Sequence, residues 1–253
     1  MCVFHKKEYI RLLTLLLTSI SLKSKIDTTT TDILILTSPE FQPMIEEEAS
    51  GFGFKLQYYT LDLHTLMEAG CARLNIFQYA NISKYDTILY LDTDVLVHSD
   101  VNVLWNLDIS SEKLYALEEA TIQHPFWGGR RFFQFSKHPN HTTAFSSGVL
   151  LFRNSDTMKN LFATIQSHIV DDITVKKNPI PKCLDQPYIV YNAIVQKKYD
   201  NQLLKEYVEN NPTETQSKKI VYHFPGFPGL YSSKYEKMTM FWEKMYKESP
   251  SNV

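Results

Sequence analysis

The stretch TILYLDTDVLV, residues 87–97, decides how the rest of the chain is interpreted. Its first five residues are β-branched or apolar, which favours a buried strand that stops abruptly at Asp92. A second apolar run, 95–97, follows at once. Asp92 and Asp94 are therefore expected on a sharp turn at the carboxyl end of a strand, flanked by residues of the buried type.

Strand-like and helix-like segments alternate on either side of this turn. Short apolar runs bounded by polar residues predict strands, and apolar residues spaced three or four apart predict helices. The predicted strands are 32–37, 54–59, 87–91, 147–152 and 220–223, and the predicted helices are 39–49, 72–82, 156–169 and 184–195. This rhythm is typical of an α/β fold with a mostly parallel, twisted sheet and helices on both faces, where ligands collect at the carboxyl ends of strands.

Composition excludes some classes of function. The chain has 253 residues, of which 43% are hydrophobic, and a formal net charge of -2. These values allow a sizeable core and argue against a nucleic-acid partner held by a basic field. Three widely spaced cysteines, Cys2, Cys71 and Cys183, form neither a disulfide framework nor a zinc pattern, so a reducing compartment is the simpler interpretation.

An apolar run near the N-terminus, 12–20, lies behind Lys6, Lys7 and Arg11 and raises the question of a targeting segment. It is shorter than the about 20 apolar residues that span a bilayer. A buried or amphipathic first helix is the favoured interpretation. The protein is accordingly expected in the cytoplasm without a membrane span, and secretory targeting is the lesser alternative.

Two carboxylates two residues apart can converge on one cation where the chain turns between them. Oxygen ligands suit Mg²⁺ or Mn²⁺, and such an ion can bridge a diphosphate that bare carboxylates would repel. Asp is also common in turns without any ligand. Acids flanked by buried-type residues are costly without a ligand, however, and this favours a metal at Asp92 and Asp94.

A haloacid-dehalogenase-like phosphohydrolase is another enzyme class with an Asp-x-Asp strand end. That motif normally lies near the N-terminus, whereas several predicted strands precede Asp92. The later acid pair that such an enzyme needs would be Asp171 and Asp172, which no apolar strand precedes. This class therefore stays an alternative.

Several ordered pieces of the chain resemble the retaining glycosyltransferases of the glycogenin and bacterial lipooligosaccharide galactosyltransferase group, family eight in the usual classification. The pieces are CARL (71–74), YDTILYLDTDVLV (85–97), FSSGVLLF (145–152), LDQP (184–187) with Tyr191-Asn192, and HFPG (223–226). Their order and spacing are more specific than any single piece.

This resemblance implies a GT-A fold, a UDP-sugar donor, Mn²⁺ with Mg²⁺ as the alternative, and transfer with retention at the anomeric carbon. Carried over by position, the metal ligands are Asp92, Asp94 and His223, and imidazole together with carboxylate suits Mn²⁺. Thr93 belongs to the same nucleotide-binding turn. Gly226 would let the backbone approach the phosphates closely.

The resemblance also implies a set of sugar-facing residues. Arg73 would reach the donor sugar or its diphosphate, for which a guanidinium is apt. Asp185 and Gln186 would face the reacting side of the sugar, where a covalent nucleophile and a front-side route both stay open. The structural alternatives are an exposed helix arginine at Arg73 and a helix N-cap at Asp185 followed by Pro187.

Further residues have weaker assignments. Ser147 and Gly148 line the sugar pocket or permit tight packing, and Glu119 or its neighbour Glu118 falls at an acidic sugar-binding position. Aromatic residues of the long 120–146 loop would stack on the acceptor or, as we favour, form a satellite core. These aromatic residues are Phe126, Trp127, Phe132 and Phe133.

The chain departs from the family pattern at Gly229, where a diphosphate-binding lysine is usual, at Ser146, where Asn is usual, and in its short first strand, 1–5. Candidates to replace the lysine are Lys234, Arg130 and Arg131. These departures sustain one more alternative, a catalytically silent protein that binds sugar nucleotides.

The sequence thus predicts one domain over 1–253, with a nucleotide-binding half over 1–100 and a sugar- and acceptor-binding half over 101–253. It would transfer a hexose, glucose or galactose, from a UDP-sugar to a hydroxyl of a glycan or protein. No nucleic-acid partner is expected, and a homodimer is left open.

Overall fold

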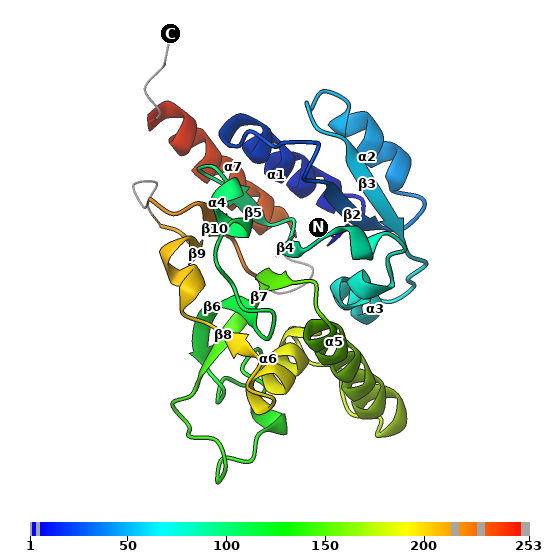
Figure 1. The fold of residues 1–253 in the computed structure, drawn as a ribbon, viewed down its shortest axis with the longest axis vertical. Coiled ribbons are helices and arrows are strands. Elements are labelled where there is room, and N and C mark those ends of the chain that lie inside the picture. Colours follow the sequence, from blue (N-terminus) through cyan, green and yellow to red (C-terminus); the bar gives the residue numbers. More distant parts are fainter. Residues whose placement is uncertain (1, 4–5, 214–217, 227–230, 249–253) are drawn as a thin grey trace. The chain divides into compact units, whose positions relative to one another are not determined.

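The computed structural model describes residues 2–3, 6–213, 218–226 and 231–248, with backbone alone at some of their ends (Figure 1). Two compact units alternate along the chain. The first comprises Met1–Leu63, Leu91–Asn106 and Glu206–Val253, and the second comprises His64–Tyr90 and Leu107–Lys205. Whether the nucleotide is bound by residues 1–100 stays a prediction.

A parallel sheet of order β1-β2-β3 lies in the first unit. Its strands are β1 (Cys2–Val3), β2 (Ile33–Thr37) and β3 (Leu56–Thr60), connected through α1 (Tyr9–Lys23) and α2 (Gln42–Ala49). The strands predicted at 32–37 and 54–59 are confirmed. The helix predicted from residue 39 begins only at Gln42, because Pro43 rather than Pro39 occupies its first turn, where proline is tolerated.

Helix α1 is the buried first helix that the sequence predicts. Its apolar residues Leu12, Leu13, Leu16 and Leu17 are at most 1% exposed, and the helix packs against α2, α7 and β5. Among the described residues, no helix is both long and apolar enough to cross a membrane.

The first unit holds a second sheet, of order β5-β10-β9. Strand β5 (Val95–Val97) pairs antiparallel with β10 (Val221–His223), which pairs parallel with β9 (Val208–Asn210). Helices α4 (Asn102–Trp105) and α7 (Tyr231–Glu248) belong to the same unit. Apolar residues of α7 join Leu96 and Tyr222 in one core, and α7 lies beside α1 in both figures.

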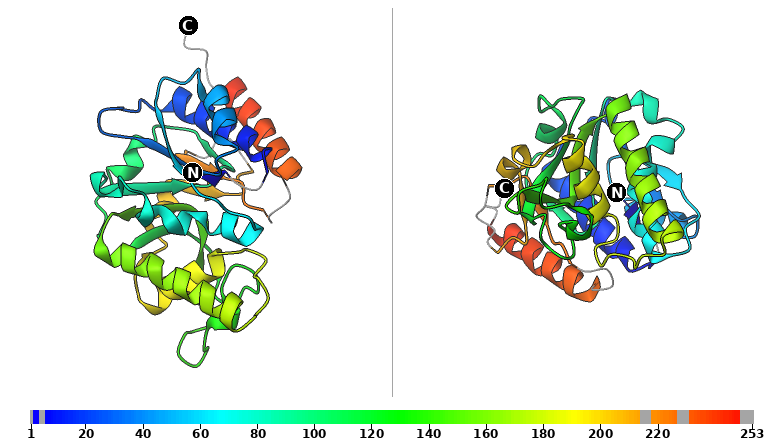
Figure 2. Two further views of the ribbon diagram at one scale, coloured as in Figure 1. Left: turned by 90° about the vertical axis from the view of Figure 1, so that its right-hand side faces the viewer. Right: turned by 90° about the horizontal axis from the view of Figure 1, so that it is seen from below.

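The second unit is built on a sheet of order β4-β7-β6-β8. Its strands are β4 (Thr87–Leu91), β7 (Thr143–Arg153), β6 (Leu114–Thr121) and β8 (Tyr199–Asp200), and its longer helices are α5 (Asp156–Ile169) and α6 (Gln186–Val195). The predictions for 87–91 and 156–169 agree with these bounds. Figure 2 shows α5 and α6 next to each other, and the two helices are in contact.

The remaining turns and short helices of the second unit are α3 (Leu66–Gly70), η1 (Ala72–Gln78), η2 (Ile82–Lys84), η3 (Arg130–Phe132), η4 (Val170–Val175) and η5 (Leu203–Glu206). The helix predicted over 72–82 is therefore wrong in type, because η1 and η2 are two short 3₁₀ helices. Leu74 and Phe77, three residues apart, share a face in the 3₁₀ geometry, and Phe77 packs on Phe152 and Phe162.

The described strand pairs agree with the predicted α/β fold with a mostly parallel sheet. The pairs β1–β2, β2–β3, β9–β10 and β6–β8 are parallel, and β5–β10 and β6–β7 are antiparallel. The alternation of elements carries no signal for the antiparallel pairs.

Candidate active site

The acidic turn lies where the sequence predicts it. Strand β4 ends at Leu91, residues 92–94 bend, and β5 begins at Val95. Thr93 and Asp94 are both 5% exposed, while Asp92 is half-buried. A buried carboxylate at Asp94 requires a compensating charge or hydrogen bonds.

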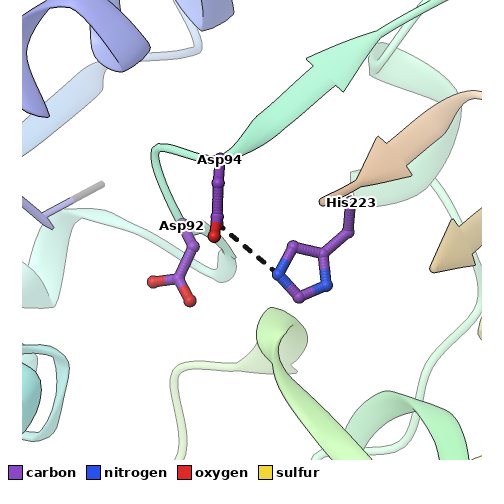
Figure 3. Close-up of side chains that lie close together, drawn as sticks. All are labelled: Asp92, Asp94 and His223. Carbon is purple, nitrogen blue, oxygen red and sulfur yellow. Dashed lines mark ion pairs between the residues drawn. The ribbon is translucent and has the colours of Figure 1, made fainter. Parts of the chain in front are cut away.

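Strand pairing brings His223 to this turn. In the antiparallel β5–β10 pair, His223 lies opposite Val95, and the N–H of Phe224 donates to the carbonyl of Asp94 at 2.9 Å. One ligand atom each from Asp92, Asp94 and His223 lie within 4.8 Å of one another. Figure 3 shows the imidazole facing Asp94, with Asp92 on the same turn.

The hydrogen bonding of His223 leaves one ring nitrogen for a ligand. Its Nδ1 lies 2.7 Å from Oδ1 of Asn210. Because that oxygen only accepts, Nδ1 carries a proton, and in the neutral imidazole Nε2 then presents a lone pair. Nε2 lies 3.5 Å from Asp94 Oδ1, a buried atom that has no hydrogen-bond partner in the described part of the chain. Two acceptor atoms face each other here, and this arrangement fits a cation between them.

Lys234 lies at the same carboxylate. Its Nζ is 2.5 Å from Asp94 Oδ2, and the lysine side chain is 12% exposed. Burial alone would raise the pKa of Asp94, but the charge of the Lys234 ammonium and its hydrogen bond hold that pKa well below its usual range. A Cβ at Gly226 would lie 3.0 Å from Cε of Lys234, so glycine makes room for the lysine stem. Gly229, the position of the usual family lysine, lies outside the described residues.

A second polar cluster lies in the other unit, around Arg73 and Asp185. Their Nε and Oδ2 atoms form an ion pair at 2.9 Å, with side chains 10% and 3% exposed. Arg73 also donates to the carbonyl of Ser147 at 2.5 Å and lies 4.6 Å from the ring centroid of Tyr90. Arg73 is thus not an exposed helix arginine. Asp185 occupies the N-cap position of α6 but makes no side-chain capping bond there. Its carboxylate is instead paired with Arg73.

Gln186 and Glu119 form the rest of this cluster. The amide of Gln186 donates to Glu119 Oε2 at 2.9 Å and to the carbonyl of Phe145 at 3.0 Å. Glu118 instead accepts from Gln202 and pairs with Lys205. The structure thereby selects Glu119 over Glu118 as the residue beside Gln186.

Local backbone strain accompanies both carboxylates of this cluster. Ala120 follows Glu119 with φ of 50°, and Leu184 precedes Asp185 with φ of 46°. Register shifts in the β6–β7 pair also fall around Glu118, and such bulges re-aim side chains. Positive φ in residues other than glycine is costly and is concentrated at functional sites. Ser147 and Gly148 are buried within β7, beneath this cluster's arginine.

A model of glycosyl transferase family 8 matches residues 64–227, more than half of the sequence. The chain belongs to glycosyl transferase family 8. This family 8 chain is therefore a glycosyltransferase, and the match covers both polar clusters except Lys234. Among curated protein sequences, none matches it.

Solved structures show the fold. The galactosyltransferase LgtC, in complex with donor and acceptor sugar analogs, matches with TM-score 0.61 and 16% identity, over 96% of this chain and 95% of that one. The bifunctional glycosyltransferase WbbM matches with TM-score 0.63 and 16% identity over 97% of this chain. This chain spans 50% of WbbM. Mouse xyloside xylosyltransferase 1 matches with TM-score 0.55 and 12% identity, over 88% and 96% of the two chains. The predicted GT-A fold is confirmed.

The phosphohydrolase alternative needs Asp171 and Asp172 as a second acid pair, but Asp172 has a structural role. In the family 8 chain, Asp172 is buried and accepts from Tyr188 at 2.6 Å and Asn178 at 2.8 Å, and it pairs with Arg131. These contacts occupy Arg131 in the second unit, and Arg130 is exposed. Of the three proposed replacements for the family lysine, Lys234 belongs to the same unit as the acidic turn and contacts Asp94.

The aromatic residues of the 120–146 loop divide into two groups. Phe132 and Phe133 pack against Tyr191, with Phe132 also against Tyr188 and His168, and so form the satellite core that we favoured. The half-buried Trp127 stacks on His124 with centroids 3.4 Å apart, and Phe126 contacts both rings. Stacking of this second group on an acceptor stays a prediction.

Two residues that contact the predicted site residues, Asn210 and Tyr90, were not predicted from the sequence. Asn210 orients His223 only because β9 and β10 pair in parallel register, and no local pattern in a three-residue strand signals that. Tyr90, beneath the Arg73 guanidinium, was counted only as a strand residue. Its position two residues before Asp92 was the available signal.

Proposed function

We propose that this family 8 glycosyltransferase transfers a hexose, glucose or galactose, from a UDP-sugar to a hydroxyl of a glycan or protein, with retention and with Mn²⁺ or Mg²⁺. The observation that carries the proposal is the pair of facing acceptors, Asp94 Oδ1 and His223 Nε2, 3.5 Å apart and buried. LgtC, a galactosyltransferase that binds donor and acceptor sugar analogs, supports a hexose donor by its similarity.

Asp92, Asp94 and His223 would hold the ion, with Asn210 fixing the imidazole tautomer. A bound divalent ion would offset the charge that develops on the leaving diphosphate, an effect worth several kcal/mol. Lys234 contacts Asp94, one of these ligands, so its ammonium could donate to a phosphate oxygen of a diphosphate bound to the ion. Gly226 leaves space for the lysine side chain.

Asp185 would stabilise positive charge at the anomeric carbon, because its carboxylate is buried and paired with Arg73. Gln186 would present its amide oxygen to the sugar, since its N–H₂ group is already directed to Glu119 and Phe145. Holding donor and acceptor in position supplies a large part of the rate in such transfers.

The experiment is donor turnover across a panel of UDP- and GDP-sugars, with Mn²⁺ or with chelator, measured as release of nucleoside diphosphate. We expect UDP-glucose or UDP-galactose to turn over with Mn²⁺ and activity to vanish with chelator. Asp94→Asn should lower turnover on the order of 10³-fold, and Asp86→Asn, at an exposed aspartate before β4, should leave it unchanged.

Activity that survives chelation would exclude the metal mechanism. Binding of UDP without turnover of any donor would instead establish the catalytically silent alternative. Turnover of GDP-sugars in preference to UDP-sugars would overturn the proposed base.

A further inference from the structure

Lys234 occupies an unfavourable place in its own helix. The buried stripe of α7 runs through Met238, Phe241 and Met245, and Lys234, four residues before Met238, continues that stripe toward the N-terminus. The N-terminal turn of a helix carries partial positive charge, which disfavours a lysine. Neither burial nor the helix explains a cation here, so its partner must.

That partner is Asp94, and the pairing is closely fitted. The Nζ–Oδ2 distance is 2.5 Å, and the two side chains are 12% and 6% exposed. Gly226 leaves the space through which the lysine stem passes. The ammonium therefore compensates a buried carboxylate whose other oxygen faces His223.

We propose that Lys234 is a resident counter-cation: it neutralises Asp94 before a metal binds, opposes metal binding to the protein alone, and passes to the donor diphosphate once metal and nucleotide are bound. This inference rests on the proposed metal-dependent function. A divalent ion and an ammonium on one carboxylate repel each other, so the ion must weaken the Lys234 contact. A diphosphate offers the displaced ammonium new oxygen partners.

Reciprocal coupling between metal and nucleotide follows from this arrangement. If the ammonium blocks Asp94 in most molecules, the apparent affinity for the metal is reduced by the fraction of molecules in which Asp94 is accessible. UDP then raises metal affinity by giving Lys234 another partner, and the metal raises UDP affinity by the same factor. A purely structural ion pair would produce no such lysine-dependent coupling.

The test measures Mn²⁺ binding to the full chain, from the electron paramagnetic resonance signal of free Mn²⁺, without and with UDP. Lys234→Met should bind Mn²⁺ at least about tenfold more tightly than wild type without UDP, and UDP should strengthen its binding less than in wild type. Lys237→Met, at an exposed lysine on the same helix, should match wild type in both measurements.

Suppose that Asp94→Asn abolishes Mn²⁺ binding but Lys234→Met binds Mn²⁺ no more tightly than wild type. The proposed role of Lys234 as a counter-cation would then be wrong, while the metal site itself would stand. Absence of Asp94-dependent Mn²⁺ binding in every variant would overturn the proposed function and this inference together. If Lys234→Met does not fold, Lys234→Gln keeps an N–H donor without the charge. The same tightening is expected of it, and its absence would count equally against the proposal.

Discussion

Asp94 in the first unit and Asp172 in the second are both buried carboxylates beside a cation, yet their surroundings differ. Both oxygens of Asp172 accept hydrogen bonds, from Asn178 on one side and from Tyr188 and Arg131 on the other. One oxygen of Asp94 meets Lys234, and the other faces an imidazole lone pair without a donor.

We expect this difference to separate a structural carboxylate from a ligand-binding one. A buried acid whose two oxygens both accept hydrogen bonds stabilises the fold through those bonds, and its removal leaves the donors unsatisfied. A buried acid with an unused lone pair is costly unless another group joins it. The same residue type, at similar burial, is thus expected to serve the fold in one unit and the chemistry in the other.

The largest effect expected is on turnover. Asp94→Asn should lower glycosyl transfer on the order of 10³-fold per folded molecule, because loss of the metal ligand removes several kcal/mol of transition-state stabilisation. Asp172→Asn should stay near wild type when rates are normalised to the folded fraction from circular dichroism. Comparable losses in the two variants would remove the distinction drawn above.

Substitution of Asp172 should instead affect the stability of the fold. Asp172→Ala should lower the free energy of unfolding by about 2–3 kcal/mol, since Tyr188 and Asn178 lose a buried acceptor. Arg131, about a third exposed, adds little because solvent screens it. Urea denaturation measures the change. Asp171→Ala is the control, because the Asp171–Lys176 ion pair is largely exposed. This variant should change the free energy of unfolding by less than about 0.5 kcal/mol.

Neighbouring glutamates sharpen the contrast within one strand. Glu119→Ala should lower transfer about tenfold, because Gln186 loses the acceptor that directs its amide. Glu118→Ala removes only contacts to Gln202 and the exposed Lys205, so its rate should stay within about twofold of wild type. Steady-state kinetics of both variants checks this, and equal rates would return the choice between the two glutamates to an open question.

The smallest effect expected is on the pH dependence of stability. Burial would raise the pKa of Asp172, but hydrogen bonds from Tyr188 and Asn178 and the charge of Arg131 hold it below its usual value. A carboxyl with a depressed folded-state pKa stabilises the protein above its unfolded pKa of about 3.9, and this stabilisation is lost as pH falls through the folded value. The stability gap between wild type and Asp172→Asn should therefore be constant above about pH 5 and shrink toward about pH 3. A gap that widens on acidification would show that the pKa is raised.

Much of the site was predictable because its residues carry local signals. The apolar run before Asp92, the glycine-containing HFPG piece and the Asp185-Gln186 pair are short patterns. The structure places them at the end of β4, at the end of β10 and at the start of α6. The buried role of α1 followed from the length of its apolar run. Lys234 was one of three candidates, and its four-residue spacing from Met238 was a usable sign of a buried face.

The remaining features depend on contacts between distant segments. Antiparallel pairing of β5 with β10 sets His223 beside Asp94, and a register shift sets Glu119 rather than Glu118 beside Gln186. Strands of three residues do not encode their partner or direction. The choice of a 3₁₀ helix for η1 also depends on tertiary packing, since Phe77 lies against aromatic residues of β7 and α5.

The discontinuous first unit also has a consequence for the order of events during protein synthesis. Asp92 and Asp94 leave the ribosome before residues 107–205 of the second unit, and His223 and Lys234 emerge only after those residues. While the second unit is being synthesised, the two carboxylates are therefore exposed without the imidazole and the ammonium that neighbour Asp94 in the folded protein.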